Sequence, residues 1–227
     1  MIDRAMYFSK SECWIMLQKA GMDRIIAFED LGDDEITDAE IADAFISLTS
    51  RGLIEGEGDT FKISDRLVPY INALRQAVCV VIERRNMDRY PVSCIYLGNA
   101  DALRVEMDCS SGAKVALRLC GTDSFIDEET GYEFMPDKAS DLPADYEDYT
   151  ADVKTWEDSF RDDSSLLIYY RVYDVKNCEL IKRIFVKRES LCELIITENP
   201  NGDQLVFGYS NQKMSEVLRA TIGGEIQ

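Results

Sequence analysis

The sequence predicts an α+β fold, in which an N-terminal winged-helix-like unit leads into an antiparallel sheet. Apolar residues recur at spacings of three and four through residues 1–77, which is the periodicity of amphipathic helices. From residue 78 the period shortens to two, as in strands that bury one face. The strand-like segments are separated by short turns that only hairpins can bridge, so neighbouring strands are expected to be antiparallel.

The first expected helix begins at Ser9 or Ser11, either of which can cap it, and ends near Ala20. Gly21 follows, a residue suited to the left-handed conformation that ends many helices. The apolar face of this helix consists of residues at helical spacing, namely Cys13, Met16, Leu17 and Ala20, widened by Trp14. A short apolar piece at 25–28 and an acidic loop at 29–35 separate it from the next element.

The N-terminal unit continues with a helix, a hairpin and another helix. Residues 37–40 form a capping box that predicts a helix from Thr37 to about Ser50. Its expected apolar face contains Ile41, Phe45 and Leu48, with Ala42 and Ile46 beside it. Residues 53–63 indicate a two-stranded wing that turns at 55–58. Ser64 can cap the helix that follows, in which Leu67, Ile71 and Leu74 form the buried stripe. Pro69 lies inside this helix, so either the helix starts near 67–68 or it has a kink.

A meander of four strands is expected next, at residues 78–85, 92–97, 102–108 and 114–120. In the third strand Arg104, Glu106 and Asp108 alternate with Leu103, Val105 and Met107. This alternation predicts that one face of the sheet is solvated.

Residues 121–165 interrupt the strand pattern with glycines, prolines and an excess of acidic side chains. Val153, Trp156 and Phe160 lie at helical spacing, so the second half of this segment is expected to form an acidic amphipathic helix. Its expected role is a solvated helix that covers one face of the sheet. The spacing of the carboxylates matches no calcium-binding loop.

A second meander is expected at residues 166–176, 179–189, 191–197 and 204–209, followed by a helix over 211–221. The layout of a meander plus a helix thus occurs twice, which predicts a pseudo-twofold repeat in the sheet. Three units follow from this division: 1–77, 78–165 and 166–227, which we expect to pack as one compact body.

The side-chain inventory disfavours an enzyme. The chain has no histidine, which removes His-based triads, imidazole acid–base chemistry and histidine metal sites. Seven cysteines occur without a C-x-x-C pair, so we expect reduced, structural thiols, no metal and no cofactor. Only a convergent pair of buried carboxylates in a pocket would support catalysis.

Net charge argues against nucleic acids and membranes as partners. The chain carries −18 overall, and residues 121–163 alone contribute fifteen acidic and three basic side chains. Such a chain repels phosphates and anionic lipids. No apolar run approaches the roughly 20 residues that span a bilayer, and the N-terminus has no apolar signal core, so a cytoplasmic protein is expected.

The alternative function is a winged-helix transcriptional regulator with a C-terminal sensor or dimerisation domain. Recognition of DNA requires basic and amide side chains on the helix that enters the groove. The helix over 37–51 instead carries Asp38, Glu40 and Asp43 against Arg51 alone, and residues 1–77 have eight basic and fifteen acidic side chains. We therefore expect an acidic surface on this helix and no nucleic-acid partner.

The order of elements resembles the EspG family, cytosolic chaperones of type VII secretion systems. The resemblance lies in Leu48-x-x-Arg51-Gly52-Leu53-Ile54, the wing, the helix over 67–74 and the strand over 78–85. It extends by order of elements through the first meander, including residues 95–97 and 115–117, and beyond residue 120 it is one of layout. The chain is shorter, more acidic and poorer in alanine and arginine than typical members.

This resemblance implies a binding protein without catalytic residues. Its sheet and C-terminal helical region would hold one end of a helical-hairpin secretion substrate and keep an apolar tip soluble until export. The expected partner is a small helical secreted protein, and the chaperone is expected to be a monomer or a homodimer.

One strand offers a candidate partner surface. Leu167, Tyr169, Arg171, Tyr173 and Val175 alternate along it, and a basic strip follows with Lys182, Arg183, Lys187 and Arg188. Tyrosine and arginine are enriched at interface hot spots, so Tyr169, Arg171, Tyr173 and Lys187 are the candidate partner-binding residues. The alternative is a central strand packed under a helix, with Arg171 at its margin.

Overall fold

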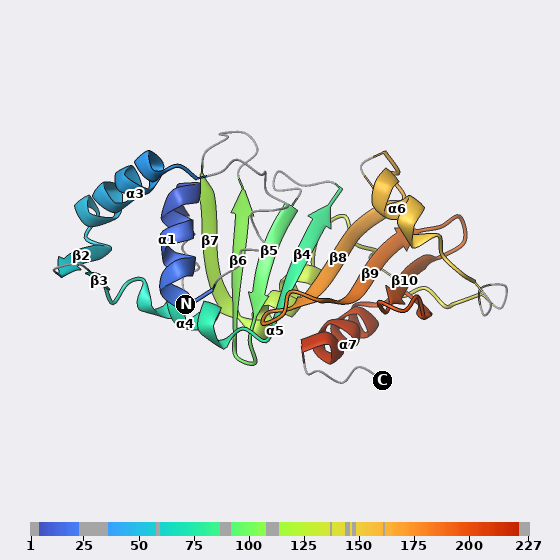
Figure 1. Cartoon of the computed structure of the whole chain (residues 1–227). Helices are drawn as coiled ribbons and strands as arrows, with labels where there is room; N and C mark the ends of the chain where they lie inside the picture. The colour runs from blue at the N-terminus through green and yellow to red at the C-terminus, as the bar shows by residue number, and fades with distance from the viewer. Residues whose placement is uncertain are drawn as a thin grey trace.

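One antiparallel sheet organises the fold in the computed structural model (Figure 1). The structure describes residues 5–22, 36–57, 60–86, 92–107, 114–136, 138–143, 146, 149–160 and 162–222. Within them the sheet has nine strands in the order β1-β7-β6-β5-β4-β8-β9-β10-β11. These are β1 (Met6–Phe8), β4 (Cys79–Arg85), β5 (Val92–Leu97), β6 (Asp101–Met107), β7 (Val115–Gly121), β8 (Leu166–Asp174), β9 (Leu180–Arg188), β10 (Glu193–Glu198) and β11 (Gln204–Gly208). The predicted α+β class and both meanders are confirmed.

The centre of the sheet is the antiparallel pair of β4 and β8. β4 begins a meander that ends in α5 (Thr122–Thr130), and β8 begins one that ends in α7 (Asn211–Ile222). The register places Ile82 opposite Arg171, and Arg84 opposite Tyr169. This order of elements agrees with the expected layout, while a pseudo-twofold repeat stays a prediction.

The N-terminal helices are α1 (Lys10–Ala20), α3 (Asp38–Ser50) and α4 (Val68–Gln76), with a hairpin of β2 (Ile54–Glu57) and β3 (Thr60–Ile63) between the last two. Ser9 and Thr37 each cap their helix in a capping box, as their local sequence predicts. Gly21 adopts φ 80° at the end of α1. The helix–hairpin–helix order is present, and the winged-helix assignment itself stays a prediction. The apolar piece at 25–28 lies outside the described residues.

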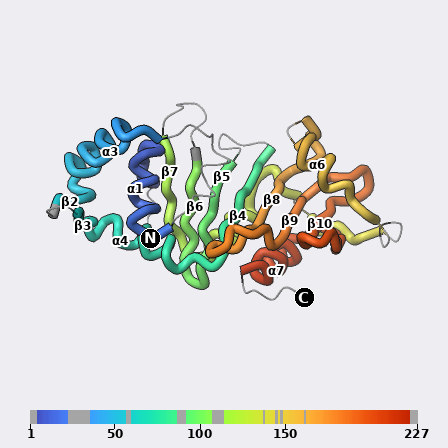
Figure 2. The backbone as a smooth tube through the Cα atoms, viewed as in Figure 1, coloured from blue at the N-terminus to red at the C-terminus, as the bar shows by residue number. Residues whose placement is uncertain are grey.

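Helices cover both faces of the sheet. On one face α1, α3 and α4 share a core with β4–β7, and α6 (Val153–Ser159) shares another with β8–β10. On the opposite face α5 and α7 pack against the central strands. Figure 2 shows that α3 and the β2–β3 hairpin extend beyond the β1 end of the sheet, so the molecule is elongated. No helix in the described part of the chain is both long and apolar enough to span a bilayer.

Three local features differ from the sequence prediction. The short strand β1 and the helix α5 were not expected. In α3 the buried residues are Ala44 and Leu48, whereas Ile46 is 68% exposed. Because α3 contacts its neighbours along one side only, its buried stripe is narrower than its apolar residues suggest.

Candidate protein-binding surface

The first candidate for chemistry is a cluster of charged side chains buried between the sheet and α5. It contains Glu83 and Arg85 from β4, Arg104 and Glu106 from β6, and Glu129 from α5, each at most 4% exposed. Arg85 Nη2 donates a hydrogen bond of 2.9 Å to Glu106 Oε1, and its Nε lies 3.2 Å from Glu83 Oε1. Arg104 donates to Glu129. Each of these carboxylates therefore has an arginine partner.

This cluster corrects the prediction of a solvated face on the third strand. Arg104 and Glu106 do alternate with apolar residues, but each is only 2% exposed. The helix α5 and the ring of Tyr132 lie against Arg104 and replace water as its environment. Asp108 lies outside the described residues. The alternation predicted which residues share a face of the sheet. This face excludes water because α5 covers it.

Glu129 is the most perturbed carboxyl in the cluster. Its Oε1 accepts a hydrogen bond of 3.0 Å from Tyr132, and its Oε2 accepts one of 2.7 Å from Tyr170. Burial raises the pKa of Glu129 to about 8. Since these groups are enclosed and paired with one another, the cluster attaches α5 to the sheet and presents no carboxylate to a substrate.

Most thiols of the described residues are buried in the core. Six of these cysteines are in no disulfide, and four of the six are buried (Cys13, Cys79, Cys94 and Cys192). Burial raises the pKa of the Cys79 thiol to about 12, and it raises the pKa of Cys13 further. A protonated thiol is a poor nucleophile and a poor metal ligand. Among the described residues, no group of three or more Cys, Asp or Glu side chains is placed to hold a metal.

The second candidate is the region where α6 lies on β8 and β9. A β-bulge between Leu166 and Ile168 moves Leu167 to the opposite face, where it joins the core under α5 and α7. The predicted five-residue alternation from Leu167 to Val175 is therefore wrong at its start. Tyr169, Arg171 and Tyr173 do share the face that α6 covers in part.

Tyr169 lies beneath α6 and is completely buried. Its ring stacks on Phe185 of β9 with 4.2 Å between centroids, and Phe160 follows at 6.1 Å. Burial raises the pKa of its hydroxyl, and Glu157 reinforces the shift. Tyr169 thus supports the surface from below.

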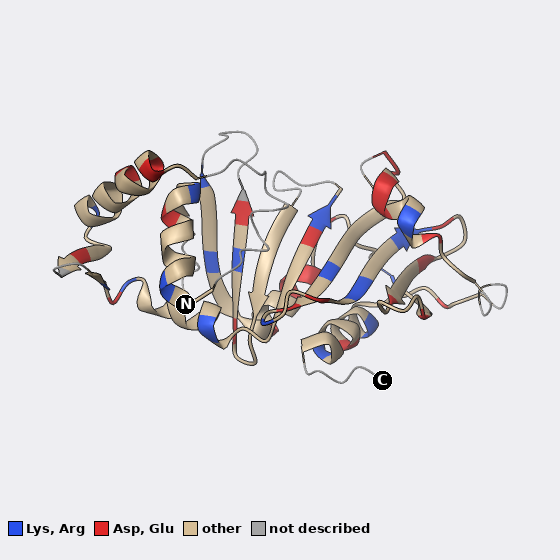
Figure 3. Ribbon diagram, viewed as in Figure 1, with Lys and Arg blue, Asp and Glu red and all other residues tan. Residues whose placement is uncertain are grey.

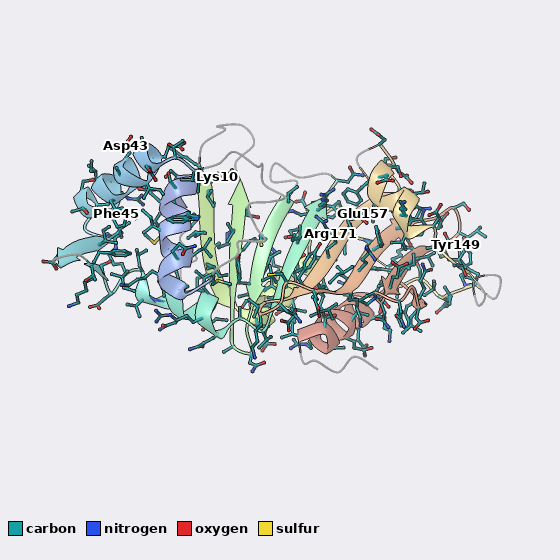
Figure 4. All side chains as sticks on the ribbon, in the orientation of Figure 1. Lys10, Asp43, Phe45, Tyr149, Glu157 and Arg171 are labelled. Carbon is teal, nitrogen blue, oxygen red and sulfur yellow. The ribbon has the colours of Figure 1, made fainter. Side chains whose placement is uncertain are left out.

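Arg171 and Lys187 lie at the margin of α6. Arg171 Nη1 is 3.7 Å from Glu157 Oε1, and Figure 4 shows the two labelled side chains side by side. Lys187 Nζ is 4.4 Å from the centroid of Trp156 and 2.7 Å from Glu189 Oε1. The structure therefore brings Tyr169, Arg171 and Lys187 together around one helix. This is the alternative arrangement, a central strand packed under a helix with Arg171 at its edge.

Tyr173 lies two residues after Arg171 on the same face of β8, where it is half-buried opposite Val80 of β4.

The basic strip divides between the two faces of the sheet. Arg183 and Lys187 point toward α6, while Lys182 pairs with Val172 and points away from α6. Figure 3 marks basic positions in blue along the ribbons of β8 and β9, and acidic positions in red on α3 and α6. Whether Tyr169, Arg171, Tyr173 and Lys187 contact a partner stays a prediction.

Two residues of this surface were not assigned to it from the sequence. Glu157 lies 3.7 Å from Arg171 and 3.6 Å from Arg183, so it bridges β8 and β9. Trp156 packs edge-on against Phe185 at 5.7 Å. The helical spacing of Val153, Trp156 and Phe160 was the available signal, since it places Glu157 beside the apolar stripe.

A cavity of about 450 Å³ adjoins α6 and is lined by Ala151, Asp152, Val153, Lys154, Glu157, Asp158, Arg183 and Glu198.

The fold and this surface define a class of protein: a nine-stranded antiparallel sheet with helices on both faces, whose candidate site is a helix-covered surface of aromatic and basic side chains. No family model matches the sequence, and no curated protein matches it.

Solved structures do match. One is the Mycobacterium tuberculosis type VII secretion system chaperone EspG5 in complex with a PE25–PPE41 dimer. The match has a TM-score of 0.54 and 8% sequence identity, and it covers 96% of each chain. The resemblance to EspG chaperones that the sequence indicated is thus confirmed at the level of the fold.

Proposed function

We propose that this chain is a cytosolic chaperone or adaptor that binds a helical-hairpin substrate of a type VII-like secretion system. The observation that carries the proposal is the fold that it shares with EspG5 over 96% of both chains. EspG5 is named a chaperone, and in that structure it is bound to a PE25–PPE41 dimer. Nearly complete coverage in both directions means that this chain has counterparts for almost all of that chaperone.

The proposed partner surface is the margin of α6, with Arg171, Tyr173 and Lys187 as contact residues and Tyr169 as their support. Arginine and tyrosine supply large contact area together with polar reach. The basic side chains of this face also suit a partner that presents carboxylates.

The charge of α3 argues against the alternative function, a winged-helix transcriptional regulator that binds DNA. Asp38, Glu40 and Asp43 are exposed on this helix, as the sequence predicted. Phosphate contacts dominate the affinity of proteins for DNA, and an acidic helix opposes them. We therefore expect no binding to double-stranded DNA at physiological salt.

The proposal is tested by capturing the tagged protein from its native cytosol and identifying bound proteins by mass spectrometry. Recovery of a stoichiometric small helical secretion substrate supports it. Recovery of DNA, or of no partner under conditions that preserve weak complexes, contradicts it. Light scattering on the captured complex gives the stoichiometry and distinguishes a monomeric chaperone from a homodimer.

Two substitutions locate the surface, and a third serves as the control. Tyr173→Ala and Arg171→Ala are each expected to weaken capture at least tenfold. Arg219→Ala removes the same charge from α7, where Arg219 pairs with Asp123, and is expected to leave capture unchanged. If Tyr173→Ala captures as much partner as the unmodified chain, the proposed surface is wrong.

A further inference from the structure

The helix α6 is too short to be stable by itself. It has seven residues, and its N-cap is Asp152, which accepts hydrogen bonds of 3.2 Å from the Thr155 amide and 2.6 Å from the Thr155 hydroxyl. Isolated helices of fewer than about 12 residues are marginal in water, so α6 depends on what lies beneath it.

We call the surface of β8–β10 that α6 covers the groove, and its floor is aromatic. Tyr169 and Phe185 form its base, and Leu194 and Ile196 of β10 complete it, all of them fully buried. Val153, Trp156 and Phe160 enter it from above, each at most 8% exposed. Their positions i, i+3 and i+7 are those by which an amphipathic helix fills a groove.

Basic side chains lie at the rim of the groove, and one carboxylate of α6, that of Glu157, contacts two of them. Glu157, at position i+4, lies 3.7 Å from Arg171 and 3.6 Å from Arg183, while Arg183 makes a closer contact of 2.9 Å with Glu198. Lys187 lies over the Trp156 ring. Ion pairs of this kind at a partly exposed rim stabilise little, so the apolar contacts hold α6 in place.

We infer that the groove on β8–β10 is a receptor for one amphipathic helix of the secretion substrate, and that α6 fills it in the unbound chain. The partner helix carries apolar or aromatic side chains at i, i+3 and i+7 and a carboxylate at i+4, which is the pattern of Val153, Trp156, Phe160 and Glu157. The inference rests on the proposed function, since that function supplies a helical partner. The inference adds to that function the residue pattern by which the groove recognises the partner helix.

The length of the covering helices differs between the two faces of β8 and β9, and this difference favours displacement of α6 by a partner helix. The opposite face is covered by α5 and the 12-residue α7, whereas α6 has seven residues, with the side chains of Tyr146 and Tyr149 packed beside it. Because α6 is tethered, it competes with a partner at an effective concentration on the order of millimolar, and weakening α6 strengthens partner binding.

The direct test uses a labelled peptide of residues 150–163 as the probe and fluorescence anisotropy as the measurement. In the Trp156→Ala chain the internal helix is weakened, so the peptide of unmodified sequence is expected to bind at least tenfold more tightly than it binds the unmodified chain. The same peptide with Trp156→Ala is the matched control and is expected to show no such gain. The Arg219→Ala chain should behave as the unmodified one.

If a folded Trp156→Ala chain binds the peptide no more tightly than the unmodified chain does, the groove is not an exchangeable receptor. Hydrogen exchange on the unmodified chain decides the question even if that variant fails to fold. The amides of α6 are expected to exchange at least tenfold faster than those of α7, and equal protection in the two helices would overturn the inference. Neither result depends on capture from cytosol, so this inference can fail while the chaperone proposal stands.

Discussion

The carboxylate of Glu129 on α5 accepts a hydrogen bond from the hydroxyl of Tyr170 on β8, with 2.7 Å between the two oxygens. Both residues are 0% exposed. The bond connects the helix that follows the first meander to the strand that begins the second. The two halves of the sheet are thereby joined through buried polar groups as well as through the β4–β8 ladder.

Removing this hydroxyl is expected to destabilise the fold. Tyr170→Phe leaves one oxygen of a buried carboxyl without its donor, which costs about 1–3 kcal/mol. Urea unfolding followed by circular dichroism measures the loss. The matched control is Tyr7→Phe, because Tyr7 is half exposed and water can replace its hydroxyl. Equal unfolding midpoints for the two variants would contradict the role of the Glu129–Tyr170 bond.

The raised pKa of Glu129 predicts a pH dependence of stability. Burial raises the pKa to about 8 from an ordinary value of 4.5, so the folded state holds a proton that the unfolded state releases at lower pH. The contribution of this group is therefore complete below about pH 4.5 and is lost as the pH rises toward 8. Glu129→Gln cannot titrate and should remove this contribution.

Urea unfolding at pH 5 and pH 8.5 checks the sign. The unmodified chain should lose more stability between the two values than Glu129→Gln does. The prediction fails if the two chains show the same change in the free energy of unfolding.

Local signals in the sequence were sufficient for the elements that they control. Ser9 with Glu12, and Thr37 with Glu40, are residues three apart that define a helix start by their own hydrogen bonds. Turn residues and alternation likewise predicted the meanders, because hairpins are local structures. The helix α5 was missed because its segment is acidic, and its N-cap, Gly121, offers no side-chain hydrogen bond.

The sequence did not predict which segments of the chain cover each face of the sheet. Alternation placed Arg104 and Glu106 together, but their burial depends on Glu129 and Tyr132, which lie 23 or more positions later in the chain. The bulge at Leu167 changes which residues share the face of Tyr169, and one extra residue in a strand leaves no mark in composition. The candidate surface was therefore found in part, without Glu157 and Trp156.

Arg51 joins three N-terminal elements, and its removal should loosen them. Its Nη1 donates to both oxygens of Glu12 at 3.1 Å, and its Nη2 donates to the carbonyl of Tyr7 at 2.9 Å. Glu12 is 4% exposed, so Arg51→Ala leaves a buried carboxylate with Ser47 as its remaining side-chain partner outside its own helix turn. A loss of about 1–3 kcal/mol is expected in urea unfolding. Arg66→Ala, at an exposed position, is the control and should change stability by less than about 0.5 kcal/mol.

The segment around Ser140 and Ala151 covers part of β11, the last strand of the sheet. Ser140 N donates to the Tyr209 carbonyl at 2.7 Å, and the Gln204 side chain bonds both the amide and the carbonyl of Ala151, at 2.9 and 3.0 Å. Gly208 lies where this cover approaches most closely, since a Cβ there would overlap the Ser140 carbonyl oxygen. An uncovered edge strand is a template for pairing with another chain.

Gly208→Ala is therefore expected to displace the cover rather than to strain the strand. The overlap involves backbone that cannot rotate away, so a loss of about 1–3 kcal/mol is expected, together with faster proteolysis between residues 138 and 152 and increased self-association. Gly56→Ala is the matched control, because a Cβ at Gly56 meets no atom within 4 Å. Urea unfolding, limited proteolysis and light scattering on the two variants make the comparison. If Gly208→Ala matches Gly56→Ala in all three, the segment does not protect the edge of β11.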